Sequence, residues 1–138
     1  MAALLQSAQA AAASARDPVA KLRRIIGAHA DHYWDHSWDL VILFGQRRYL
    51  SPARQRRIIA LERVYLDLVR GIIRDGVSRR VFRRVDPTVA AFSLFAILNT
   101  LDSWYERKGA LRPKDLVRQI ERLYLGGLVM RRRPHARG

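Results

Sequence analysis

Residues 51–76, SPARQRRIIALERVYLDLVRGIIRDG, decide the fold class, because they have the pattern of one long amphipathic helix. Apolar residues recur in this stretch at alternating spacings of three and four, at Ile58, Leu61, Tyr65, Leu68 and Ile72. That spacing places them on one face of a helix, as a seam that packs against other helices. Ser51-Pro52 marks the N-terminus of this helix, because serine caps a helix N-terminus and proline is favoured at the first helical position. We expect Gly76 to end the helix as a C′ residue.

The same cap-then-proline signal divides the rest of the chain into helical segments. Asp17-Pro18 and Asp86-Pro87 each open a helix, and Pro113 opens the last one. With the alanine-rich start, the sequence predicts about six helices, over residues 2–15, 17–33, 38–48, 51–76, 86–108 and 113–130. No alternation of apolar and polar residues typical of strands persists anywhere. The predicted fold class is therefore all-α, a helical bundle.

Length and composition favour one globular domain. The chain has 138 residues, of which 49% are hydrophobic, and it contains no cysteine. The absence of cysteine excludes disulfides, thiolate catalysis and cysteine-based zinc sites. The longest uncharged stretch, residues 87–101, is too short to span a membrane, and no basic residue precedes the apolar part of the alanine-rich start. We therefore expect a cytoplasmic protein with no membrane partner.

The formal net charge of +14 has two interpretations. Of 26 basic residues only Lys21, Lys108 and Lys114 are lysines, and so strong an arginine bias is typical of a GC-rich coding background. The alternative is attraction to polyanions, which would make the chain a free-standing basic helical protein that binds nucleic acid or anionic surfaces non-specifically. The arginines are spread along the chain, so both interpretations stay open.

The segment from Val89 to Leu101 carries no charge, and its apolar residues point around most of the helix circumference. Such a helix is buried on more than one side, which in a domain of this size indicates a core face and a partner face. We infer a homodimer in which the last helix is the companion, since Gly126 and Gly127 allow close approach of another helix. The predicted interface residues are Phe92, Leu94, Phe95, Leu98, Leu116, Ile120, Leu123 and Gly127.

A set of short motifs occurs in a fixed order along the chain. They are Asp17-Pro18 with Lys21-Leu22-Arg23, Arg48 to Pro52, Ile73 to Val77 ahead of Val81-Phe82-Arg83, Asp86-Pro87, Leu98-Asn99, Ser103-Trp104-Tyr105, Leu111-Arg112-Pro113 and Leu125 to Leu128. Together they resemble the C-terminal domain of TetR-family transcriptional repressors. The pattern is most similar to the branch that includes repressors of steroid and fatty-acid breakdown, and it covers nearly the whole chain from residue 17.

This resemblance implies that residues 17–130 form a ligand-binding and dimerisation domain. Members of that branch bind acyl-CoA thioesters and dimerise through their last two long helices, so it implies a homodimer and a small apolar effector such as an acyl-CoA. In the family an N-terminal three-helix unit docks into DNA, and a fourth helix links it to the ligand domain. Residues 1–16 resemble only the end of that linking helix, so we expect no sequence-specific DNA binding by this chain alone. Residues 131–138 are expected to form a basic flexible tail.

The candidate ligand-binding residues are aromatic and polar side chains on the predicted helices. They are Trp38, Phe44, Arg48, Tyr65, Asn99 and Trp104. Resemblance places the helix of Trp104 beside the ligand cavity, and a buried Asn99 must be hydrogen-bonded to a helix or a ligand. Arg48, with the arginines that follow Ser51-Pro52, could hold CoA phosphates. The alternatives are ordinary core aromatics and a solvated basic turn.

Metal binding and catalysis find little support. His29, His32 and His36 share a face on a continuous helix, but a polar helix end with local Asp–His pairs explains them as well, and we expect no metal site. The sequence holds no glycine-rich phosphate loop and no Ser–His–Asp arrangement. We expect a protein that is not an enzyme and has no cofactor.

Overall fold

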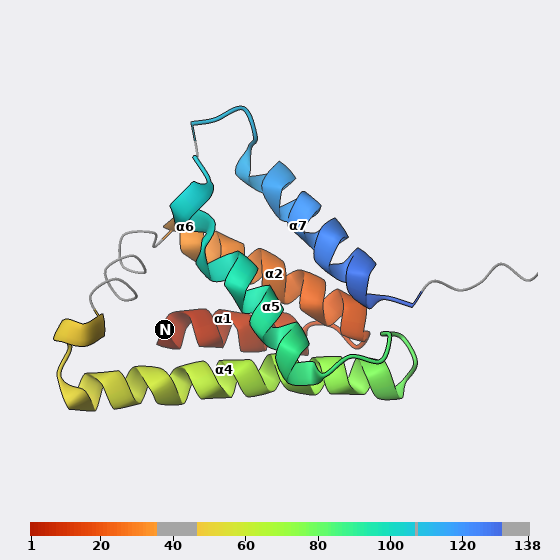
Figure 1. Ribbon diagram of the computed structural model, residues 1–138, viewed down its shortest axis with the longest axis horizontal. Helices are drawn as coiled ribbons and strands as arrows, with labels where there is room; N and C mark the ends of the chain where they lie inside the picture. Colours follow the sequence, from red (N-terminus) through yellow and green to blue (C-terminus); the bar gives the residue numbers. More distant parts are fainter. Residues whose placement is uncertain (36–46, 107, 131–138) are drawn as a thin grey trace, which may run out of the picture.

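The computed structural model describes residues 1–35, 47–106 and 108–130, and it confirms the predicted all-α fold class (Figure 1). Over these residues the chain forms helices and connecting turns, and the only β pairing is an isolated antiparallel bridge between Phe82 and Val129. The α-helices are α1 (Ala2–Ala13), α2 (Pro18–Asp35), α4 (Pro52–Ser78), α5 (Pro87–Asn99), the one-turn α6 (Leu101–Trp104) and α7 (Pro113–Leu128). No membrane-spanning helix is found among these described helices, because none combines the required length with sustained hydrophobicity.

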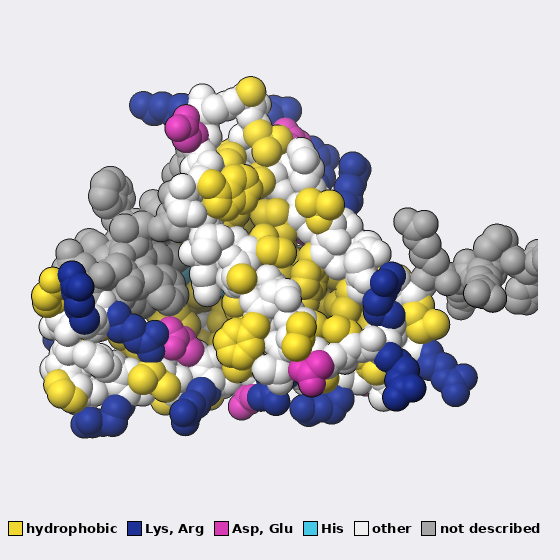
Figure 2. Space-filling model, viewed as in Figure 1, with side chains coloured by type: hydrophobic (Ala, Val, Ile, Leu, Met, Phe, Trp, Pro, Cys, Tyr) yellow, Lys and Arg dark blue, Asp and Glu magenta, His cyan; other side chains and the backbone are white. Residues whose placement is uncertain are grey.

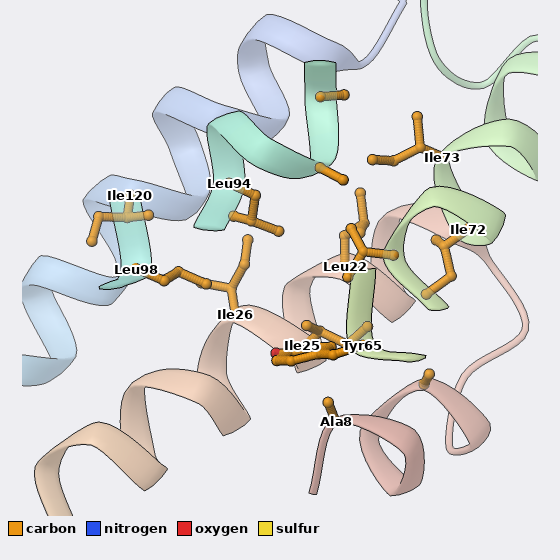
Figure 3. Close-up of a cluster of buried hydrophobic side chains, with 14 of the residues drawn as sticks. Ala8, Leu22, Ile25, Ile26, Tyr65, Ile72, Ile73, Leu94, Leu98 and Ile120 are labelled. Atoms are coloured by element: carbon orange, nitrogen blue, oxygen red, sulfur yellow. The ribbon is translucent and has the colours of Figure 1, made fainter. Parts of the chain in front are cut away.

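Helix α2 is the centre of the bundle, since it packs against α1, α4, α5 and α7. Its residues Leu22, Ile25 and Ile26 are fully buried. Figure 3 shows how they meet side chains from the surrounding helices, among them Tyr65 and Ile73 of α4. The long helix α4 runs along one edge of the molecule, with α1 beside it and α5 crossing it (Figure 1).

The three predicted N-caps are present. The side chain of Asp86 accepts hydrogen bonds from the backbone N–H groups of Thr88 and Val89, at 2.8 and 3.0 Å. Asp17 accepts one from Ala20 at 2.9 Å, and Ser51 Oγ accepts a longer one from the first turn of α4 at 3.4 Å. Each cap satisfies N–H groups that have no partner inside the helix, so it fixes where the helix begins.

The predicted end of α4 is wrong by one turn. Gly76 does not end the helix, which continues to Ser78, and the left-handed residue after it is Arg80, with φ of 57°. Gly76 instead contacts the segment that follows the helix. It is buried, and its carbonyl accepts hydrogen bonds from the N–H groups of Val81 and Phe82 at 2.9 and 3.0 Å, so the chain folds back over it.

The predicted helix over residues 86–108 is two helices. Helix α5 ends at Asn99, the short α6 follows, and the backbone is extended at Tyr105. At the junction Thr100 Oγ1 donates a hydrogen bond to the carbonyl of Ala96 at 2.7 Å. A threonine that binds the preceding turn in this way disfavours a regular helix. The predicted helix over residues 38–48 lies mostly outside the described residues, and Arg47–Tyr49 forms the 3-10 turn η1. The predicted tail, residues 131–138, also lies outside them.

Candidate functional site

A cavity of about 530 Å³ lies among α1, α2, α4 and α5. Its volume falls within the range of small-molecule sites. Most of its wall is apolar or aromatic. The lining residues are Met1 and Leu4 at the start of α1, His29 of α2, Ile59, Glu62, Arg63, Tyr65 and Leu66 of α4, and Phe92, Phe95, Ala96 and Asn99 of α5.

The innermost polar groups of the cavity are His29 and Tyr65, which are each only 2% exposed. Nδ1 of His29 and Oη of Tyr65 are hydrogen-bonded at 3.1 Å, so they join α2 to α4. Burial lowers the pKa of His29 to about 4, with His32 acting in the same direction, while a hydrogen bond to the Asn99 side chain raises it. Burial also raises the pKa of Tyr65 well above its usual range. Both side chains are therefore uncharged at neutral pH.

Aromatic rings surround this polar pair. The ring of Phe95 lies edge-on against Tyr65, with centroids 4.8 Å apart, and 6.3 Å from His29. Edge-to-face contacts of this kind hold the rings in fixed orientations. The aromatic part of the cavity wall on the α5 side consists of Phe95 and Phe92, and the side chain of Phe92 is 57% exposed.

Charged groups lie on the α4 side of the cavity. Glu62 receives two hydrogen bonds from the guanidinium of Arg47 on η1, at 3.0 and 3.2 Å, in a bidentate pair. Such pairs are strong and directional. Arg63 lines the cavity as well and is exposed. The charges are thus at the solvent side of α4, whereas the deeper wall is uncharged.

The structure brings together two of the six predicted ligand-binding residues. Tyr65 and Asn99 line the cavity, whereas Arg48 and Trp104 do not. Arg48 lies over the ring of Tyr49, 4.8 Å from its centroid, and Trp104 is 56% exposed at the end of α6. Trp38 and Phe44 lie outside the described residues.

Sequence reasoning missed the contribution of His29 to this cavity. The signal was present, because His29 falls on the apolar face of α2, in register with Leu22, Ile25, Ile26 and Tyr33. A histidine in an otherwise apolar stripe must find a polar partner when it is buried. Among the described residues no group of three His, Cys, Asp or Glu side chains is placed to hold a metal ion, and His36 lies outside them.

The predicted interface residues lie in three places: the core, the cavity wall and the exposed surface. Leu94, Leu98, Leu116 and Ile120 belong to the core of the single chain, so they have almost no surface left for a partner. Phe95 lines the cavity, and so does the exposed Phe92. Phe92, Leu123 and Gly127 are exposed, and Leu123 is 78% exposed. Periodicity predicted that these helices have a core face and a partner face, but it did not assign each residue to one of them. Only the exposed residues are available to a second copy of the chain.

Comparison with known proteins identifies the family. The family described as "Tetracyclin repressor-like, C-terminal domain" matches residues 15–128. The chain belongs to this family. A comparison with curated protein sequences found no match.

Solved structures of TetR regulators have the same fold. The PfmR regulator of Thermus thermophilus superposes with a TM-score of 0.84 at 29% identity, over 91% of this chain and 69% of its own. A TetR/AcrR regulator of Thermobifida fusca gives 0.81 at 27% identity, over 90% and 66%. AibR, solved with isovaleryl coenzyme A and operator DNA, gives 0.75 at 19% identity, over 86% and 64%. The chain thus spans about two thirds of each of these regulators.

Proposed function

We propose that this TetR-family domain binds a small apolar effector in the cavity among α1, α2, α4 and α5, and that it acts as a homodimer. The cavity is the observation that carries the proposal. It is largely apolar, it holds a few polar groups at fixed positions, and its volume suits a small molecule, which are the usual properties of a ligand site.

The effector we propose is an acyl-CoA thioester whose acyl part occupies the cavity. AibR, which shares the fold, was solved with isovaleryl coenzyme A. We assign the acyl group to the cavity of about 530 Å³, because its wall is largely apolar, and the charged nucleotide to the solvent side. There Arg63 is available to a phosphate, and Arg47 becomes available if a phosphate displaces Glu62. Arg48 and Trp104, which do not line the cavity, have no part in this version of the proposal.

Helix α1 is the proposed route by which the effector acts on the rest of a regulator. Met1 and Leu4 line the cavity from the start of α1, and Leu4 is 2% exposed. α1 also packs on both α2 and α4. A ligand that fills the cavity therefore touches the helix that resembles the end of the linking helix of TetR repressors.

The proposed dimer face is made of exposed residues on α5 and α7. Val89 and Phe92 of α5 are 60% and 57% exposed, and Leu123 of α7 is more exposed still. Gly126 and Gly127 follow Leu123 on the same side of α7, and an added Cβ at either would meet nothing within 4 Å. Figure 2 shows hydrophobic side chains gathered over α5 and the adjoining part of α7, with Lys and Arg side chains mainly around the margin. An apolar face with room for close helix approach supports a helix-packed dimer.

Thermal unfolding in the presence of a small ligand panel tests the proposal. We expect decanoyl-CoA to raise the melting temperature more than decanoate, and decanoate more than CoA alone. A ligand at 100 times its dissociation constant stabilises the native state by about 2.7 kcal/mol, which is a shift of several degrees. An equal shift with CoA alone would show that the apolar cavity does not determine binding, and no shift with any of them would contradict the proposal.

DNA titrations separate this proposal from non-specific binding of polyanions. Because the net charge is +14, some affinity for DNA is expected, but it should be equal for an operator and a scrambled duplex and should fall steeply with salt through counterion release. A preference for one sequence at physiological salt would contradict the proposal. Tight DNA binding that persists at that salt, with no response to the ligand panel, would favour the polyanion-binding alternative.

A further inference from the structure

The wall of the cavity holds three uncharged polar side chains that come from three different helices: His29 of α2, Tyr65 of α4 and Asn99 of α5. We propose that these three residues recognise one uncharged hydrogen-bonding group of the effector, a hydroxyl, amide or carbonyl oxygen, and select against a carboxylate at that position. The inference rests on the proposed function, because it assigns the chemical class of the ligand that the cavity takes.

The hydrogen-bonding capacity of the pair fits such a group. If Tyr65 donates its O–H to Nδ1, then the N–H of His29 donates to the Asn99 side chain, the Tyr65 oxygen keeps an acceptor site and the Asn99 amide keeps its N–H donors. If His29 donates from Nδ1, then its other nitrogen accepts from the Asn99 amide, Tyr65 keeps its O–H donor and the Asn99 oxygen stays an acceptor. Either arrangement leaves at least one donor and one acceptor on Tyr65 and Asn99. A hydroxyl or a carbonyl group of the effector can therefore form its hydrogen bonds with these uncharged side chains.

A carboxylate at this position would lack a compensating charge. Arg63 is the only cationic side chain among the described lining residues, and it lies on the exposed side of α4. His29 does not supply a positive charge at neutral pH, because burial holds its pKa at about 4. Phe95 packs beside both His29 and Tyr65 and provides no polar group. Moving an unpaired carboxylate out of water into such surroundings is strongly unfavourable.

Titration calorimetry with three decyl compounds at pH 7.5 tests the inference: 1-decanol, decanamide and decanoate. We expect decanol and decanamide to bind at least tenfold more tightly than decanoate. Tyr65→Phe keeps the packed ring and removes the hydroxyl, so it should reduce the preference for decanol over decanoate about fivefold. Tyr124→Phe is the matched control, because the Tyr124 hydroxyl donates to the carbonyl of Ala90 at 2.7 Å and does not line the cavity.

The possible outcomes separate the two proposals. If decanoate binds as tightly as decanol, or if Tyr65→Phe leaves the preference unchanged, the recognition of an uncharged group is wrong while the proposed cavity stands. If neither the decyl compounds nor decanoyl-CoA bind to the wild type, the proposed function itself is wrong. Asn99→Leu provides a second variant at an exposed position, in case Tyr65→Phe does not fold, and it should also reduce the preference. If decanoate binds with its carboxylate at α4, then Arg63→Gln should weaken the binding of decanoate and leave the binding of 1-decanol and decanamide unchanged.

Discussion

The ring of Phe82 lies directly against the Cα of Gly76, so that a Cβ on Gly76 would be 2.1 Å from Cδ2 of that ring. Phe82 is 1% exposed, and the bridge to Val129 fixes its backbone, so the ring cannot move aside. Gly76→Ala should therefore lower the free energy of unfolding by roughly 1–3 kcal/mol through overpacking. Urea denaturation of the two proteins measures this difference.

Gly71→Ala in the same helix is the matched control for this change. An added Cβ at Gly71 meets nothing within 4 Å, and alanine is a better helix former than glycine. We expect Gly71→Ala to raise the free energy of unfolding by up to about 1 kcal/mol. If both variants gain stability to the same degree, then the ring of Phe82 does not occupy the space beside Gly76.

Burial of uncharged His29 makes stability depend on pH. The pKa is about 4 in the folded chain and 6.5 in an unfolded one, so between these values the unfolded chain binds a proton that the folded chain does not. The free energy of unfolding is therefore highest, as far as His29 is concerned, above pH 6.5. It falls by roughly 3 kcal/mol in all as the pH is lowered towards 4. The groups that set this pKa are His32 on the same helix and Asn99 on α5, and Tyr65 on α4 is hydrogen-bonded to the ring.

The comparison with His29→Gln isolates this contribution. The variant lacks the titrating group, so its free energy of unfolding should fall less than that of the wild type between pH 7.5 and pH 4.5. Denaturant titrations at the two pH values measure the two changes, and the comparison holds even if the variant is less stable at both. Equal changes in the two proteins would show that His29 is not held uncharged by burial.

The proposed dimer face predicts the effect of a charge on α7. Leu123→Glu places a carboxylate in the middle of an apolar interface, so we expect it to weaken the dimer by at least tenfold and to give monomers at micromolar concentration in sedimentation velocity. Val64→Glu is the control, because Val64 is an exposed apolar residue of α4, 47% exposed, and does not belong to the proposed dimer face on α5 and α7. A wild type that sediments as a monomer at that concentration would rule out the dimer.

The fold was largely predictable because its signals are local. Asp86 and Pro87 lie within three residues of the N–H groups that the cap satisfies, so the start of α5 follows from the sequence alone. The ends of α4 and α5 depend on more distant groups. Gly76 looked like a helix terminator, but its role is set by Phe82, six residues further on in a turn that the sequence does not define.

The site was predictable only in part, because periodicity shows which residues face away from water but not what they face. Leu94 and Phe92 both belong to an uncharged helix, yet Leu94 is in the core of the chain and Phe92 is 57% exposed. Tyr65 could be proposed for the cavity as an aromatic side chain at helical spacing, and Asn99 because a lone amide among apolar residues needs a partner. Trp104 was proposed from resemblance, and its position was set by the break at Thr100, which the sequence analysis did not predict.

The most direct test of the central claim, that the effector occupies the cavity among α1, α2, α4 and α5, is titration of decanoyl-CoA into a cavity-filled variant. Ala96 lines the cavity, so Ala96→Trp fills it without adding a charge, and Ala60→Trp adds the same side chain at an exposed position of α4 that does not line it. We predict that Ala60→Trp binds decanoyl-CoA like the wild type and that Ala96→Trp binds it at least tenfold more weakly. Equal affinity in all three folded proteins would contradict the account.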